Sequence, residues 1–352
     1  MIDQNIYITH YSSHFKEKVI CLLKYMWKSL DYNERVRKFE WRYENNPYEK
    51  ELVIYLAIDD EKVVGFRPLV VQHFILNGSR LRVLSGADVI IHPEYRNRKI
   101  WTKINQYYFK DINNSHINTI DLTLSAGKNT ALGSIKQGWQ FMTDKMIYSY
   151  KVFFPSIMTA ALDKKKTFMT DKFFQCSDDK YNFILSNKLE AKEMSFLNSK
   201  INHFDTIKKD RNEKYFLWKY SYEPQLYSYI YLRKGATLSG YVVLKRLSRC
   251  KASIEEYSVP DIIIFQKMIN IAAKQLKISI FKFLVLSDHQ RKLSRGCWFL
   301  EENAIALKVL RKERFPALIR PVKPEPLAVD FLFKGIDIRN TGSWELYPGD
   351  IH

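Results

Sequence analysis

The hydrophobic pattern of the first part of the chain predicts two helices followed by antiparallel strands. Apolar residues recur at helical spacing from Phe15 to Lys28, and Asn46-Pro47 ends a second helical stretch, since a residue before proline disfavours the helical conformation. The strands expected next lie at 52–59, 63–75 and 81–91. Asn77-Gly78, between the last two, is typical of a hairpin turn.

The pattern after this hairpin alternates between helices and strands. It predicts a helix over 99–110, a strand over 119–124, a short helix that ends at Gly138-Trp139 and a strand over 146–154 that closes the half. This order indicates an α+β fold, in which a mixed but mainly antiparallel sheet is flanked by helices.

A second copy of this pattern follows later in the chain. Trp41-Arg42-Tyr43 precedes a proline by the same spacing as Trp218-Lys219-Tyr220, and a Gly-aromatic strand follows each of them, at Gly65-Phe66 and Gly240-Tyr241. We therefore expect two tandem domains of one fold. Their expected bounds are 1–155 and 188–352, joined by a lysine-rich connecting segment over 156–187.

Composition narrows the class of protein. The formal net charge of +18 attracts anions such as phosphorylated small molecules, and the basic residues are scattered, so we do not expect a nucleic-acid partner. The four cysteines form no CxxC pair, which favours a reducing cytoplasm and no metal site. No leader pattern opens the chain, and no apolar run reaches the roughly 18 residues of a membrane-spanning helix.

The junction from Val89 to Lys103 carries the clearest candidate chemistry. A β-branched strand ends at Pro93, an arginine-rich turn follows, and a helix begins. Such a junction directs free backbone N–H groups and the positive end of the helix dipole at one point, where a diphosphate binds well. Arg96, Arg98 and Lys99 add full positive charges. The alternative is an ordinary turn with a solvated basic face.

This junction resembles motif A of the GNAT superfamily of N-acetyltransferases, whose pattern is Arg/Gln-x-x-Gly-x-Gly/Ala. Lys99 stands at the first glycine position and Trp101 at the second. The resemblance implies acyl-CoA as a co-substrate and no metal. The residues that it places against the cofactor are Val89, Ile90, Ile91, Arg96, Asn97, Arg98, Lys99, Ile100, Trp101 and Asn129.

Four further segments extend the resemblance: 41–47, 64–67, 87–96 and 136–139. With them the chain is similar to bacterial tandem-GNAT N-acyltransferases that acylate amino sugars for surface polysaccharide. The resemblance implies two GNAT-like domains and an acceptor amine on a nucleotide-linked, in particular dTDP-linked, amino-dideoxy sugar used for O-antigen or capsule.

Three residues are candidates for the proton transfers. Acylation needs an uncharged amine, so a group must accept a proton, and Asp88 is the favoured base because it is a carboxylate in an apolar strand. The alternative is an Asp that caps a turn or pairs with Arg67 or Arg82. His92 is the second candidate base. The resemblance places Ser134 where related enzymes have a tyrosine that protonates the leaving thiolate.

The second half has no arginine-rich turn at the equivalent place, so we expect it to have lost cofactor binding and to contact the acceptor instead. Candidate acceptor-binding residues in the two halves are Arg67, His73, Tyr220, Tyr222, Glu256 and Asp350. For each residue of the second half singly, the alternative is an aromatic core or capping role.

Two other functions remain open at this point. One is an aminoacyl transferase of the peptidoglycan-bridge type, which fits the positive charge. The other is a non-catalytic nucleic-acid-binding protein built from degenerate GNAT domains, which the replaced glycines favour. The sequence does not determine the acyl chain, the sugar or the oligomeric state.

Overall fold

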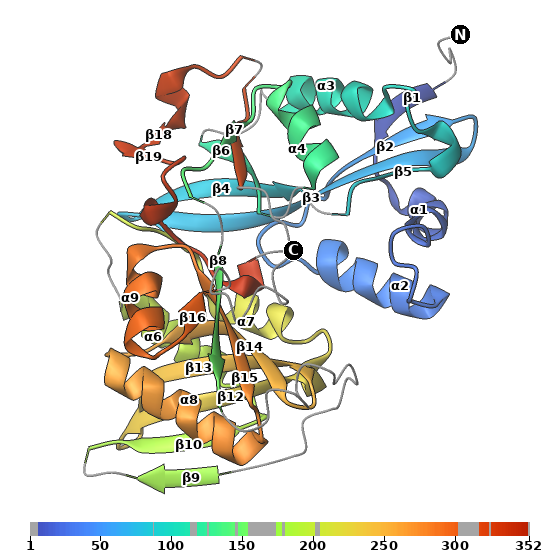
Figure 1. The fold of residues 1–352 in the computed structure, drawn as a ribbon. Helices are drawn as coiled ribbons and strands as arrows, with labels where there is room; N and C mark the ends of the chain where they lie inside the picture. The colour runs from blue at the N-terminus through green and yellow to red at the C-terminus, as the bar shows by residue number, and fades with distance from the viewer. Residues whose placement is uncertain are drawn as a thin grey trace. The chain divides into compact units, whose positions relative to one another are not determined.

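The chain folds into two units that exchange segments. Unit 1 comprises residues 1–142, 317–339 and 352, and unit 2 comprises 143–316 and 340–351. The structure is a computed structural model (Figure 1). It describes residues 6–86, 88–112, 118–124, 127–144, 147–153, 174–177, 180–200, 205–301, 317–323 and 325–350.

Unit 1 is a mixed sheet with helices on both faces. Its strands follow the order β1-β2-β3-β4-β6-β17-β7, with β5 paired to β3. The strands are β1 (Ile6–His10), β2 (Val53–Asp59), β3 (Lys62–Leu76), β4 (Ser79–Gly86), β5 (Ile90–Ile91), β6 (Thr119–Thr123), β7 (Gln140–Phe141) and β17 (Leu318–Pro321), and a separate hairpin consists of β18 (Leu332–Phe333) and β19 (Ile336–Asp337). The helices are η1 (Ser13–Phe15), α1 (Lys16–Leu23), α2 (Tyr32–Phe39), the π-helix η2 (Glu40–Glu44), η3 (Pro93–Tyr95), α3 (Ile100–Ile112), α4 (Lys128–Ile135) and η6 (Ala328–Phe331).

Unit 2 repeats the same plan. Its main sheet follows the order β16-β8-β15-β14-β13-β12-β10-β9. These strands are β8 (Ile147–Val152), β9 (Phe174–Ser177), β10 (Asn182–Ser186), β12 (Tyr227–Lys234), β13 (Thr237–Ser248), β14 (Lys251–Ser258), β15 (Ile280–Val285) and β16 (Leu300–Glu301), with β11 (Ile207–Lys209) parallel to β20 (Trp344–Glu345). The helices are α6 (Ala191–Lys200), α7 (Glu213–Lys219), η4 (Pro224–Leu226), α8 (Ile262–Leu276), α9 (Asp288–Gly296), η7 (Thr341–Ser343) and η8 (Pro348–Asp350).

The mixed, mainly antiparallel sheets confirm the expected fold class, but the domain bounds differ from the expectation. The strand expected to close the first half, β8, pairs with β15 of unit 2, while β17 from the second half lies between β6 and β7 of unit 1. A period of two identifies a strand but not its partner, so the sequence pattern could not reveal this exchange. The expected connecting segment also supplies β9 and β10, and its residues 156–173 lie outside the described residues.

The two faces of the unit 1 sheet carry separate cores. Alternation along β3 places Phe66 and Val70 on the face covered by α1 and α2, and Leu69 and Val71 on the face covered by α3. Gly65 lies under α3, where a Cβ atom would come within 2.9 Å of the Ala57 Cβ and 3.0 Å of the Ile104 Cδ1. The absence of a side chain there lets α3 pack closely on the sheet.

We expect Gly65→Ala to lower the free energy of unfolding by about 1–3 kcal/mol, because the added methyl group overpacks the interface between α3 and the sheet. Gly86→Ala is the matched control, since a Cβ atom there meets no atom within 4 Å. Urea denaturation compares the two midpoints. Equal midpoints would contradict the close packing at Gly65.

Candidate active site

The expected strand over 81–91 is interrupted, and the interruption opens the sheet of unit 1. β3 pairs with β4 up to Gly86 and then with β5 at Ile90 and Ile91. On its other side β4 pairs with β6 only from Arg82 to Ser85, and among the described residues no strand pairs with β5 there. β5 and β6 therefore diverge. The His92 N–H donates to the Val64 carbonyl, so by antiparallel alternation the polar backbone groups of Ile91 point away from β3 and into this opening.

The turn that follows β5 presents positive charge and leads into the first amides of α3. The side chains of Arg96, Asn97, Arg98 and Lys99 are exposed, and the first helical hydrogen bond of α3 runs from the Lys103 N–H to the Lys99 carbonyl. The amides before Lys103 therefore lie at the positive end of the α3 dipole. This arrangement suits a diphosphate, as the sequence predicted.

The structure also shows why a glycine is expected at position 99. Asn97 has φ 66° and Lys99 has φ 59°, both in the left-handed region. Asparagine tolerates this conformation, whereas lysine is disfavoured there by about 1–2 kcal/mol. Lys99 nevertheless keeps the backbone path of a glycine, so its side chain extends from the turn as one more exposed cation.

Asp88 lies in the interruption itself and is held by two side chains of η2. It has φ 48°, its Oδ2 is 2.8 Å from the Arg42 Nη1, and the Tyr43 hydroxyl donates to the same oxygen at 3.0 Å. The expected alternative of an arginine-paired aspartate is thus the observed geometry, with Arg42 as the partner rather than Arg67 or Arg82.

Arg67 does not face an open pocket either. Its buried guanidinium carbon lies 4.8 Å from the centre of the Trp101 ring and 4.7 Å from that of Tyr108. Its Nη2 is 3.9 Å from the Asp121 Oδ2, and the Tyr108 hydroxyl donates to the Asp121 Oδ1 at 2.6 Å. Asp121 was not among the expected site residues, although it is a carboxylate in an apolar strand and this is the feature that singled out Asp88.

The two candidate histidines lie in different surroundings. His92 is buried against Tyr25, and its pKa is lowered by burial and by the charge of Lys62, so its imidazole is neutral at pH 7. The His73 Nε2 lies 3.4 Å from the Glu49 Oε1. The Glu49 carboxylate also accepts two hydrogen bonds from the Arg82 guanidinium, one from Nε and one from Nη2. His73 therefore belongs to a cluster at the far end of β3, whereas His92 directly follows β5.

The remaining candidates of unit 1 lie on α4. Ser134 is buried, and its carbonyl accepts from the Trp139 N–H at 3.3 Å. Asn129 is in the first turn of this helix, and its side chain lies outside the described residues. α4 follows β6 directly, so both residues belong to the helix on the β6 side of the opening.

The candidates of unit 2 mostly bond one another. The Tyr220 hydroxyl donates to the Glu256 Oε2 at 2.8 Å, and the Arg211 guanidinium joins Glu256 (2.6 Å) to Asp350 (3.0 Å). All four side chains are buried, so the core and capping alternative describes Tyr220, Glu256 and Asp350 better than an acceptor pocket does. Tyr222 is only partly buried.

Unit 2 has an opening of the same kind, but its own C-terminal segment fills it. β14 pairs with β15 only from Lys251 to Ser253. Past this point the Tyr347 hydroxyl donates to the Tyr257 carbonyl at 3.0 Å, and the two rings lie 5.0 Å apart. Asp261 occupies the N-terminus of α8 and accepts from the Ile264 N–H, so an acid stands where unit 1 has cations.

The repeated Trp-basic-Tyr element has one role in both units. Tyr43 and Tyr220 each donate to the acid at the irregular point of the strand that follows, Asp88 in unit 1 and Glu256 in unit 2. This equivalence supports the duplication inferred from the sequence. The repeat was the signal that could have identified Arg42 and Tyr43 as site residues.

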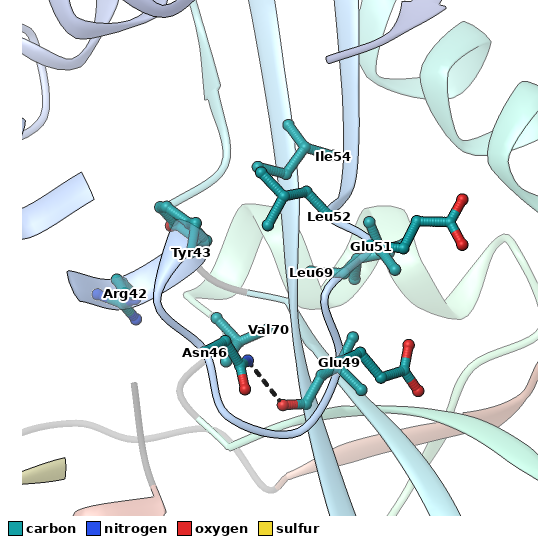
Figure 2. A pocket seen from close by; sticks show the side chains of 11 residues that line it. Arg42, Tyr43, Asn46, Glu49, Glu51, Leu52, Ile54, Leu69 and Val70 are labelled. Atoms are coloured by element: carbon teal, nitrogen blue, oxygen red, sulfur yellow. Dashed lines mark hydrogen bonds between the residues drawn. The ribbon is translucent and has the colours of Figure 1, made fainter. Parts of the chain in front are cut away.

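A recess lies beside Arg42 and Tyr43, the two side chains that hold Asp88, and it extends along the segment after η2, the start of β2 and the middle of β3. Figure 2 shows its lining: Arg42, Tyr43, Asn46, Glu49, Glu51, Leu52, Val53, Ile54, Leu69, Val70 and Val71. Its two glutamates differ, because Glu49 is paired with Arg82 whereas Glu51 is exposed.

In the part of the chain that the structure describes, no group of three or more His, Cys, Asp or Glu residues is placed to hold a metal ion. Within the same ranges, none of the helices is both long and apolar enough to cross a bilayer.

We expect stability to fall with rising pH because of Asp121. Burial raises its pKa to about 6 against the attraction of Arg67, from an ordinary value of 3.8. Because the folded state binds this proton more tightly than the unfolded chain does, protonation of Asp121 stabilises the folded state by about 3 kcal/mol when the pH is below the ordinary pKa. This contribution is lost as the pH rises through about 6. Urea denaturation of wild type and Asp121→Asn between pH 4 and 8 isolates this effect. Identical pH dependence in the two proteins would contradict it.

Comparison with known proteins agrees with this geometry. Residues 8–122 match the family model described as acetyltransferase (GNAT) domain. No curated protein matches the chain.

Three solved structures show the same fold at low identity. A conserved Enterococcus faecalis protein described as a probable N-acyltransferase has a TM-score of 0.63 at 12% identity, over 93% of this chain and 74% of its own. A GCN5-related N-acetyltransferase from Anabaena variabilis has a TM-score of 0.57 at 13% identity, over 90% and 73%. N-myristoyltransferase from Saccharomyces cerevisiae, with myristoyl-CoA bound, has a TM-score of 0.53 at 10% identity, over 97% and 90%.

The structural neighbours extend over nearly the whole chain and so cover both units, whereas the family match is confined to unit 1. Together these findings confirm the expected fold class, and the match of residues 8–122 to a GNAT acetyltransferase domain agrees with the expected enzyme class.

Proposed function

We propose that unit 1 alone binds acyl-CoA and passes its acyl group to an amine. The observation that carries this proposal is the open edge of β5 next to the cationic turn at the start of α3. The diphosphate would lie on the amides and charges of 96–101, and the thioester arm would bond the free backbone of Ile91. Unit 2 supports the proposal by contrast, because Tyr347 and Asp261 occupy the equivalent places.

The reaction needs few groups beyond this frame. The amine nitrogen attacks the thioester carbonyl, the carbon–sulfur bond breaks, and the thiolate takes a proton from solvent or Ser134. Because Arg42 and Tyr43 fix the Asp88 carboxylate, its role in the proposal is to stabilise the positive charge that develops on the attacking nitrogen. The neutral imidazole of His92 is the candidate to take the proton that the amine loses.

We propose a nucleotide-linked amino-dideoxy sugar as the acceptor, with surface polysaccharide as its use. The net charge of +18 favours an anionic acceptor, and the resemblance of the sequence to tandem enzymes of this type supports the sugar. The recess beside Arg42 and Tyr43 is the place where the amine would approach. The four unpaired cysteines are compatible with a cytoplasmic location.

Calorimetric titration with CoA tests the cofactor site. We expect one CoA per chain, because the opening of unit 2 is filled. An absence of heat at millimolar CoA, or two equal sites, would contradict the proposal. A screen of acyl-CoAs against nucleotide-linked amino sugars, read as thiol release, then tests the acceptor. Release with simple amines but with no nucleotide sugar would remove the sugar from the proposal.

We expect the double variant Arg96→Ala/Arg98→Ala to weaken CoA binding about tenfold or more, since each exposed cation contributes a charge-assisted contact to the phosphates. This loss should shrink as salt is added, because salt screens exposed charges. Lys192→Ala, which removes an exposed cation from α6 of unit 2, is the control. Calorimetry at two salt concentrations measures both. A loss equal to that of the control would place the diphosphate elsewhere.

A further inference from the structure

Below the start of α3 lies a buried polar cluster that its own side chains do not satisfy. It comprises Arg67 on β3, Asn105 and Tyr108 on α3, and Asp121 on β6, each of them at most 2% exposed. The Arg67 Nε, the Asn105 Oδ1 and the Asp121 Oδ2 are buried, and none has a hydrogen-bond partner among the described residues. The cluster thus presents a free donor on Arg67 and free acceptors on Asn105 and Asp121.

Such a cluster is costly unless something else bonds to it. A buried polar group without a partner costs about 1–3 kcal/mol, and native proteins keep few of them. Its position is informative, since β6 diverges from β5 just beyond Asp121. The unsatisfied groups therefore lie beside the opening of the sheet, next to the proposed path of the thioester arm.

Trp101 packs on the Arg67 side of this cluster. Its ring lies 4.8 Å from the Arg67 guanidinium carbon, and a Cβ atom on Gly133 of α4 would lie 3.6 Å from its Nε1. The indole thus spans from α3 to α4 beside the cluster, one helical turn before Asn105 on the same face of α3. A family glycine or alanine at this position would leave the groove between the two helices uncovered.

We propose that Trp101 is a gate over a specificity site for the amide-bearing arm of the acyl thioester. When the indole swings aside, the Arg67 Nε donates to a carbonyl of the arm and the Asn105 Oδ1 accepts from one of its amide N–H groups. This inference rests on the proposed function, because it needs the arm to enter beside β5. It assigns Trp101, Arg67 and Asn105 to recognition of the arm and leaves the diphosphate to the turn.

If Trp101 is a gate, its removal should strengthen CoA binding rather than weaken it. If the indole covers the groove in about nine-tenths of the free molecules, the apparent affinity for CoA is weakened about tenfold. Trp101→Ala should therefore bind CoA up to about tenfold more tightly and faster than wild type. Trp298→Ala, which removes a 79% exposed tryptophan of unit 2, is the matched control. Stopped-flow mixing and calorimetry with CoA measure the association rate and the Kd.

A second variant tests the polar cluster itself. Asn105→Leu removes an unsatisfied buried acceptor at similar size, so the free protein should keep or gain thermal stability while its Kd for CoA rises about fivefold. A role confined to packing would leave the Kd unchanged.

The outcomes separate this inference from the proposed function. If wild type binds one CoA but Trp101→Ala has the same rate and Kd, or Asn105→Leu has the wild-type Kd, the gate and its site are wrong and the cofactor site stands. If neither wild type nor Trp101→Ala binds CoA, both fail.

Discussion

The interruption of one strand between Gly86 and Ile90 is the constraint on which the rest of unit 1 depends. From Arg82 to Ser85, β4 pairs with β6, so the backbone groups between these two strands are already hydrogen-bonded and cannot bind a ligand. The break lets β5 stay on β3 but leave β6, which frees the polar groups of Ile91 and directs the chain into the turn before α3. The clamp of Arg42 and Tyr43 on Asp88 stabilises the break, because it satisfies a carboxylate held in a left-handed backbone conformation.

Duplication makes the second unit an internal reference for the first. Both units keep a tyrosine bonded to an acid at the irregular strand, so the frame is shared. They differ in what enters the opening. In unit 2 the Tyr347 hydroxyl donates a hydrogen bond to the Tyr257 carbonyl, and the nearby Asp350 forms a buried ion pair with Arg211. A segment held this firmly fills the place in unit 2 that stays open in unit 1.

The sequence predicted the elements better than their partners. Periodicity located the helix that became α3, the strands around the Asn77-Gly78 hairpin and the cationic turn, because each depends on neighbouring residues. It did not predict the exchange of β8 and β17, nor the pairing of Arg42 with Asp88, because both depend on contacts between distant segments. Trp101 was recognised as a departure from the family glycine, but its packing over Arg67 required the structure.

Hydrogen exchange measured with and without CoA tests the central claim, that only the interrupted strand of unit 1 receives the cofactor. We expect slower exchange in peptides covering 88–103, where the freed backbone of β5 and the first turn of α3 would be bonded to the ligand. Peptides covering 255–264 should not change, because the equivalent groups there are already hydrogen-bonded within the chain. Protection of 255–264 instead, or of neither segment at saturating CoA, would contradict this claim.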